Sequence, residues 1–218
     1  MQQAQEVYVP ALEAGKILYP DLSQGPKFSL NTEGEYSSNT AYFIPSNDWV
    51  LLGLLNSNVT WFYLRGISDA MRGGVWRLRM FTQNIETIPI PDLKGKTIAR
   101  LSEDCQKASE ACYALQQALT RRIPDLAAPD IEPKLTNKLK SWWEFPDFAA
   151  FRKEVKKALK ADIPLSERSD WEDWIARDKA EIARLTAEIK SNEDRINAII
   201  YDVFNLTQDE IILLEASL

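Results

Sequence analysis

The feature that most constrains this fold is a change of hydrophobic period at Ile88–Pro91. The sequence reads IPIP there, and two prolines so close together exclude both a helix and a central strand. Upstream, short apolar runs bounded by Gly, Ser, Asn and Pro predict strands. Downstream, apolar residues recur at alternating spacings of three and four, as in a helix with a narrow packing seam. We therefore expect an α+β chain with a β-rich domain at 1–92 and a helical domain at 93–218.

The β-rich part contains three predicted strands and a short helix pair. The strands are KILYP (16–20), KFSLN (27–31) and AYFIP (41–45), separated by turn-forming segments, which predicts an antiparallel meander or hairpin. The helices follow between residues 46 and 66, with Ser46 or Asn47 as the predicted N-cap and a break at Asn56-Ser57.

The helical part contains two long seams. The first consists of Ile98, Leu101, Cys105, Ala108, Cys112, Leu115 and Leu119, and the second of Ile175, Asp178, Ile182, Leu185, Ile189, Asn192, Ile196, Ile199 and Val203. Two such helices, joined by a connector long enough to reverse direction, predict an antiparallel coiled-coil-like pair. Two alternatives stay open: both helices lie on the β-rich part, or the seams bind a partner chain.

Composition excludes several classes of function. The 218 residues contain no histidine, which removes the commonest general base and the commonest zinc ligand. No apolar run is long enough to span a bilayer, and the N-terminus lacks the features of a secretory signal. We therefore expect a cytoplasmic protein with no membrane partner. Cys105 and Cys112 are about 10 Å apart on one helix, too far for a disulfide.

One pattern suggests a magnesium nuclease. Asp147, Glu154 and Lys156 follow the P-D…E-x-K order, but such carboxylates converge from neighbouring strands. Here they fall on a predicted helix, where Glu154 and Lys156 project in different directions. We disfavour this reading, and the sequence predicts no catalytic residue and no metal site.

A basic strand follows a Gly-Gly pair in MRGGVWRLRMF (71–81). Alternation places Arg77 and Arg79 on one face, and Trp76, Leu78 and Met80 on the face that enters the core. Arg65 and Arg72 lie just upstream. Four arginines against Asp69 alone, in a chain of net charge −6, indicate an anionic partner. The plain alternative is a solvated strand face.

Three segments, in order and spacing, resemble a known family. They are KILYPDLSQGPKFSLNTEGEYSSNTAYFIP, LLGLLNSNVTWFYLRGIS and GGVWRLRMFTQNIETIPIP. They resemble the TaqI-like C-terminal specificity domain, which is the target-recognition domain of type IIG restriction-modification enzymes and adenine-specific DNA methyltransferases. The tail, from SDWEDW to DEIILLE, also looks like the helical end of such proteins.

The resemblance implies a role for each candidate residue. Double-stranded DNA would be the partner. Arg77 and Arg79 would contact bases or phosphates, Arg65 and Arg72 would contact phosphates, and Gln83 and Asn84 would pair with adenine edges. The helical half, in which residues 101–218 carry 17 basic and 23 acidic residues, would face away from DNA or toward a catalytic domain.

The chain departs from full-length family members in lacking the N-P-P-Y-type tetrapeptide and the glycine-rich S-adenosylmethionine loop. We therefore expect a C-terminal fragment of a DNA methyltransferase. It would have no enzymatic activity and no cofactor of its own. S-adenosylmethionine would belong to an N-terminal catalytic domain of the same polypeptide, with or without a nuclease. The alternative is a helical protein-interaction scaffold that docks the catalytic domain or another subunit.

Overall fold

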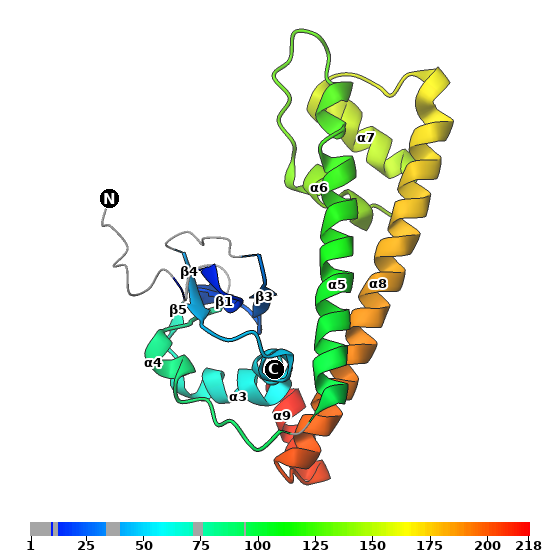
Figure 1. Cartoon of the computed structure of the whole chain (residues 1–218). Coiled ribbons are helices and arrows are strands. Elements are labelled where there is room, and N and C mark those ends of the chain that lie inside the picture. Colours follow the sequence, from blue (N-terminus) through cyan, green and yellow to red (C-terminus); the bar gives the residue numbers. More distant parts are fainter. Residues whose placement is uncertain (1–9, 11–12, 34–39, 72–75, 94) are drawn as a thin grey trace, which may run out of the picture. The chain divides into compact units, whose positions relative to one another are not determined.

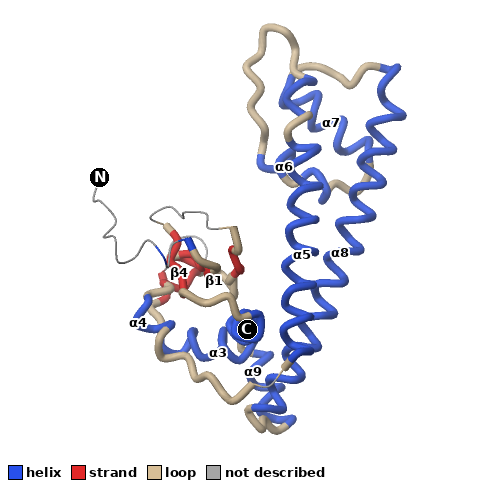
Figure 2. The backbone as a smooth tube through the Cα atoms, viewed as in Figure 1, coloured by secondary structure: helices blue, strands red, loops and turns tan. Residues whose placement is uncertain are grey.

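A computed structural model of the chain describes residues 10, 13–33, 40–71, 76–93 and 95–218 (Figure 1). The chain divides into two compact units. Unit 1 comprises Met1–Gln106 and Ser191–Leu218, and unit 2 comprises Lys107–Lys190. The predicted α+β class is confirmed: small antiparallel sheets come first, and a mainly helical part with two long helices follows (Figure 2). The division into a β-rich domain at 1–92 and a helical domain at 93–218 stays a prediction.

The first sheet has the strand order β3-β1-β4 and is antiparallel throughout. Its strands are β1 (Lys16–Pro20), β3 (Ser29–Asn31) and β4 (Ala41–Ile44). All three were expected, although β3 is shorter than the predicted run. Ile17 pairs with Leu30 on one side and with Ile44 on the other, so the central strand carries apolar side chains to the core.

The second sheet has the order β2-β6-β5 and includes two strands that the sequence did not predict. Its strands are β2 (Leu22–Ser23), β5 (Ala70–Met71) and β6 (Arg77–Arg79). β2 lies in a segment expected to be a turn, and β5 lies in one expected to be a loop. Both contain only two residues, which is too short for an alternating pattern to appear.

The helix pair consists of α2 (Trp49–Leu55) and α3 (Asn58–Ile67), and the short α4 (Thr82–Ile85) follows β6. Asp48 caps α2 by accepting a hydrogen bond from the Val50 N–H at 2.7 Å, so the predicted cap at Ser46 or Asn47 is wrong by one or two residues. Ser57 caps α3, which explains the predicted break between the helices.

Unit 1 is completed by residues far along the sequence. Leu54 is fully buried in a cluster with Ile98, Leu101, Ile196 and Ile200. The Asn197 side chain accepts a hydrogen bond from the backbone N–H of Asn58 at 2.8 Å, and the Asn58 amide donates to the Tyr201 hydroxyl at 2.9 Å. The Gln106 amide bonds both backbone groups of Leu30 in β3. The C-terminal residues are therefore an integral part of unit 1.

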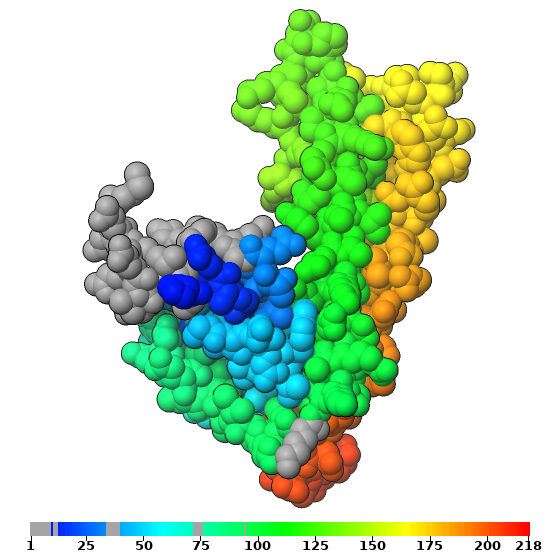
Figure 3. All heavy atoms as spheres, viewed as in Figure 1, coloured from blue at the N-terminus to red at the C-terminus, as the bar shows by residue number. Residues whose placement is uncertain are grey.

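Two long helices, α5 (Lys96–Thr120) and α8 (Arg168–Val203), run through both units. In unit 1, Ile98 and Leu101 of α5 share a cluster with Ile196 and Ile200 of α8. In unit 2, the Cys112 thiol lies 3.8 Å from the Ile182 carbonyl oxygen. Since low numbers on α5 meet high numbers on α8, the helices are antiparallel, and their surfaces touch in Figure 3.

The seam residues behave as the spacing predicts. Buried members include Ile98, Leu101, Ala108, Cys112, Leu119, Ile175, Ile182, Leu185 and Ile196, and also the polar Asp178 and Asn192. The Asp178 carboxylate accepts a hydrogen bond from Arg177 at 2.9 Å, so this buried charge is paired. The two seams therefore face each other within one chain.

The remaining elements of unit 2 lie between the long helices in sequence: η2 (Ile123–Leu126), α6 (Asn137–Lys140), η3 (Trp142–Glu144), α7 (Phe148–Leu159) and η4 (Leu165–Glu167). Trp142 is fully buried, and its indole N–H donates to the Gln116 carbonyl at 3.0 Å. Phe151 stacks on Trp171 with ring centroids 6.2 Å apart. These aromatic residues are core.

The last helix, α9 (Gln208–Ala216), begins at a capping box formed by Thr207 and Glu210. It belongs to unit 1, where the Glu215 carboxylate accepts a hydrogen bond from the Tyr201 hydroxyl at 3.1 Å. Within the described residues, no helix is long and apolar enough to cross a membrane.

Candidate nucleic-acid interface

The arginine pair is positioned by β6, the central strand of the second sheet. Leu78 pairs with Ser23 on one side and with Ala70 on the other. Leu78 and Met80 are fully buried in the core. Because successive side chains of a strand point to opposite faces, Arg77 and Arg79 project away from this core, and both are half-buried.

Arg79 is held from two sides. Its guanidinium lies 3.5 Å from the Asp21 carboxylate and 5.1 Å from the centre of the Phe81 ring. The Arg79 side chain nevertheless keeps 42% of its surface exposed. A pair exposed to this degree contributes little to stability, but it fixes where the guanidinium points.

Three polar atoms on this face are buried and have no hydrogen-bond partner within the part of the chain that the structure describes. They are Asp21 Oδ1, Arg77 Nε and Arg79 Nε. Buried polar groups are paired in most native structures. Two of these atoms belong to the β6 arginines themselves, and the third belongs to Asp21, the ion-pair partner of Arg79.

Arg65 is occupied by contacts inside unit 1. It belongs to the last turn of α3, donates a hydrogen bond to the Leu218 backbone oxygen at 2.5 Å, and lies 4.5 Å from the centre of the Trp76 ring. Trp76 was expected to enter the core but is 40% exposed. It makes a T-shaped contact with Trp61, and the Arg65 guanidinium lies over its ring. Trp76 is therefore a rim residue rather than a core residue.

Gln83 and Asn84 lie in α4, directly after the arginine strand. Gln83 is exposed, whereas Asn84 is half-buried and its amide donates to the Ser68 hydroxyl at 3.1 Å. Gln83 and Asn84 thus follow Arg77 and Arg79 closely in the sequence. In the structure Asn84 has an internal hydrogen-bond partner. Arg72 lies outside the described residues.

Asp21 is the residue that sequence reasoning missed. It stands at the turn between β1 and β2, and β2 pairs with β6. The only signal was its place in a turn-forming segment, which predicts a loop but not a contact with Arg79. Two-residue strands carry no period, so the pairing that brings these residues together could not be read from the sequence.

The nuclease-like pattern does not converge. Asp147 caps α7 by accepting from the Ala150 N–H at 2.7 Å, Glu154 accepts from the Thr136 hydroxyl at 3.0 Å, and Lys156 faces Asp162 at 3.9 Å. Each side chain has a different partner. Within the described ranges, no group of three or more acidic, Cys or His residues could hold a metal ion.

Comparison with protein families addresses the N-terminal part first. A family model described as a TaqI-like C-terminal specificity domain matches residues 2–90. This part of the chain is a TaqI-like specificity domain. The resemblance noted in the sequence is confirmed, and the specificity domain contains both sheets, α2 to α4 and every candidate DNA-binding residue.

A second family model, described as Domain of unknown function (DUF8810), matches residues 91–200. It covers half of the chain, so the chain belongs to this family. The two matches meet at residues 90 and 91, directly after the specificity domain. Comparison with curated proteins finds no match.

Proposed function

We propose that the chain recognises duplex DNA by its sequence and presents it to a methyltransferase or nuclease domain of the same polypeptide. The observation that carries this proposal is the match of residues 2–90 to a specificity domain. That match supports a role for residues 2–90 as the specificity part of a restriction-modification enzyme. The proposed location is the cytoplasm, as for a restriction-modification enzyme that acts on DNA inside the cell.

The candidate residues would have different roles in DNA recognition. Arg77 and Arg79 project from one face of β6, and a planar guanidinium suits guanine O6 and N7 or a phosphate. The Arg79 side chain keeps 42% of its surface exposed, which supports this role because its guanidinium stays accessible to a ligand. Gln83 would read adenine edges. Arg65 and Asn84 already have internal partners and would position the surface. Arg72 would contact phosphate.

The chemistry would belong to the parent protein, an adenine-specific methyltransferase of the type IIG kind. An adenine methyltransferase draws its target base out of the duplex, so the specificity domain would hold the flanking base pairs. S-adenosylmethionine would bind to the catalytic domain. The chain described here would have no enzymatic activity by itself.

Selection from a library of random duplexes tests this proposal. The pure chain is incubated with the library at two salt concentrations, and the bound duplexes are sequenced. We expect one short motif to be enriched, more strongly at the higher salt, because non-specific phosphate contacts weaken as salt rises. Bound pools that match the input library at both salt concentrations would contradict sequence recognition.

The alternative function, a helical protein-interaction scaffold, required a hydrophobic seam that is exposed and able to bind another domain or chain. The seam residues are instead buried inside the chain, with one another and, in unit 2, with core residues such as Trp142 and Phe151, so a docking partner would need a different surface. The proposed arrangement is an intramolecular, coiled-coil-like pair that supports the specificity domain.

A further inference from the structure

One face of α7 in unit 2 is strongly basic. Phe151, Val155 and Leu159 are fully buried and fix the side of the helix that enters the core. The other side carries Lys153, Lys156 and Lys157, and Lys160 follows as the C-cap; all four are exposed. Positions that differ by three or four residues lie on one face of a helix. These four lysines therefore form a continuous exposed stripe.

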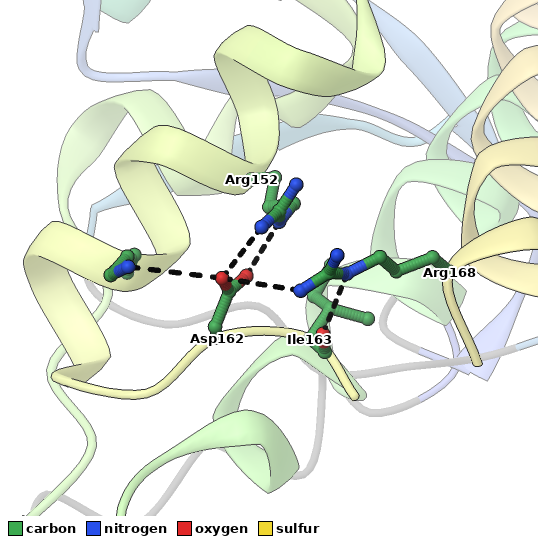
Figure 4. A network of polar contacts seen from close by, with 5 residues as sticks. Arg152, Asp162, Ile163 and Arg168 are labelled. Carbon is green, nitrogen blue, oxygen red and sulfur yellow. Dashed lines mark hydrogen bonds and ion pairs between the residues drawn. The ribbon is translucent and has the colours of Figure 1, made fainter. Parts of the chain in front are cut away.

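An ion-pair network borders this stripe (Figure 4). Arg152 donates two hydrogen bonds to the Asp162 carboxylate at 2.6 and 2.7 Å, Arg168 approaches it to 3.4 Å, and Lys156 to 3.9 Å. Hydrogen bonding from Arg152 holds the pKa of Asp162 well below its usual range. One carboxylate thus orients three cations, and the group keeps a net positive charge at neutral pH.

The charge of this region opposes that of the whole chain. Residues 134–168 contain nine basic and five acidic residues, in a chain of net charge −6. Within the described residues, no carboxylate forms an ion pair with Lys153, Lys157 or Lys160. Acidic residues resume at Asp170 on α8. The positive charge is therefore local and mostly uncompensated.

The length of the stripe fits a nucleic-acid backbone. Arg152 and Lys160 are eight residues apart, which is about 12 Å along a helix. Each strand of B-DNA presents a phosphate about every 3.4 Å of axis, so about three phosphates lie within that reach. Lysine binds phosphate as a point charge and carries no base preference.

We propose that the α7 basic face, defined as Arg152, Lys153, Lys156, Lys157, Lys160 and Arg168, binds the phosphate backbone of duplex DNA without reading its sequence. The choice of DNA over an acidic protein rests on the proposed function, because the same chain carries a specificity domain. This surface lies in the region of unknown function, residues 91–200. It assigns DNA contact to a part of the chain expected to face away from DNA.

The test replaces Lys153, Lys157 and Lys160 with Gln in the full chain. Binding to two duplexes of unrelated sequence and equal length is followed by fluorescence anisotropy over a series of salt concentrations. We expect both affinities to fall by the same factor. The slope of log affinity against log salt should become shallower by up to about three, since each lost phosphate contact removes about one. The variant K153R/K157R/K160R should bind like the wild type.

A matched control removes the same charge elsewhere. Lys96, Lys107 and Lys190 are exposed and lie outside residues 134–168, and their replacement with Gln should leave the slope unchanged. An unchanged slope in the α7 variant, or an equal change in the control, would overturn the proposal. Circular dichroism confirms that both variants are folded. Binding of a polyglutamate peptide that depends on these lysines, with DNA binding unaffected, would also overturn it and assign the face to an acidic protein.

Failure of this inference can be told apart from failure of the proposed function. If library selection enriches a motif and the α7 variant keeps the wild-type salt slope, the specificity proposal stands and the α7 proposal fails. If no motif is enriched but the salt slope depends on the α7 lysines, the α7 proposal stands and the specificity proposal fails.

Discussion

Among single residues, the two arginines of β6 differ in how they are held. Arg79 has a carboxylate partner in Asp21 and an aromatic neighbour in Phe81, so its direction is fixed before any ligand arrives. Among the described residues, the Arg77 guanidinium has no such carboxylate or aromatic neighbour. A fixed guanidinium loses less conformational freedom on binding. Arg79 is thus the better candidate for a base contact.

Substitution of these arginines separates base contact from phosphate contact. Arg79→Ala should cost about 1–3 kcal/mol in binding to the preferred sequence and relax the preference at one position. Arg77→Ala should either do the same or weaken all duplexes alike and lower the salt slope by about one. Affinity is measured by anisotropy and the preferred motif by library selection, both with the full chain. Arg100→Ala removes an exposed arginine of α5 and serves as the control. If both β6 variants keep the affinity, salt slope and preferred motif of the wild type, the two arginines lie on a solvated strand face that does not contact DNA.

The close packing around Gly53 leads to a second prediction about single residues. A Cβ atom at Gly53 would lie 2.6 Å from Ile98 Cγ2 and 2.5 Å from the Ser102 hydroxyl, and both neighbours are buried. Gly53→Ala should therefore destabilise the chain by about 1–3 kcal/mol, although alanine favours helices. A Cβ atom at Gly66, in α3, would have no neighbour within 4 Å among the described residues, so Gly66→Ala should stabilise by up to about 1 kcal/mol. Urea unfolding compares the two. Equal effects would show that α2 does not approach α5 so closely.

At the scale of elements, the helix pair depends on buried seam residues of α5 and α8. Leu185→Asp places a charge where the side chain is only 6% exposed, without a partner. It should cost about 3 kcal/mol or more. Ala187→Asp makes the same insertion two residues further on, at an exposed position of the same helix, and should cost less than about 1 kcal/mol. Thermal unfolding measures both. Similar melting temperatures for the two variants would contradict packing through this seam.

Elements with a strong local period were predictable from the sequence. The α5 and α8 seams repeat over many turns, so their burial and pairing followed from spacing. β2 and β5 have two residues each and could not be recognised. The same limit applies to the candidate site. Alternation placed Arg77 and Arg79 on one face, but the contacts of Arg79 with Asp21 and of Arg65 with Trp76 depend on tertiary pairing that no local pattern encodes.

For the whole molecule, the family boundary and the structural boundary differ. The specificity-domain match ends at residue 90, whereas unit 1 also needs residues up to Gln106 and from Ser191 onward. A fragment of residues 1–90 would expose Leu54, which is fully buried in the chain, because Ile98, Leu101 and Ile196 would be absent. We expect this fragment to lack cooperative thermal unfolding.

A designed chain provides the matching control. Residues 1–106 joined to 191–218 by a flexible Gly-Ser linker keep every member of that cluster. This chain should unfold cooperatively in a thermal melt followed by circular dichroism. Cooperative unfolding of residues 1–90 alone would show that the long helices are dispensable for the specificity domain.

The interrupted sequence of unit 1 also sets an order of events during synthesis. Translation delivers the chain from its N-terminus at about 5–20 residues per second. Unit 2 is one continuous stretch, Lys107–Lys190, and all of it precedes Ser191. The helical unit can therefore finish folding on the ribosome while the specificity domain, made earlier, still waits for Ile196 and Ile200. The part made first is completed last, so a chain truncated before residue 191 would carry a folded helical unit and an unfinished specificity domain.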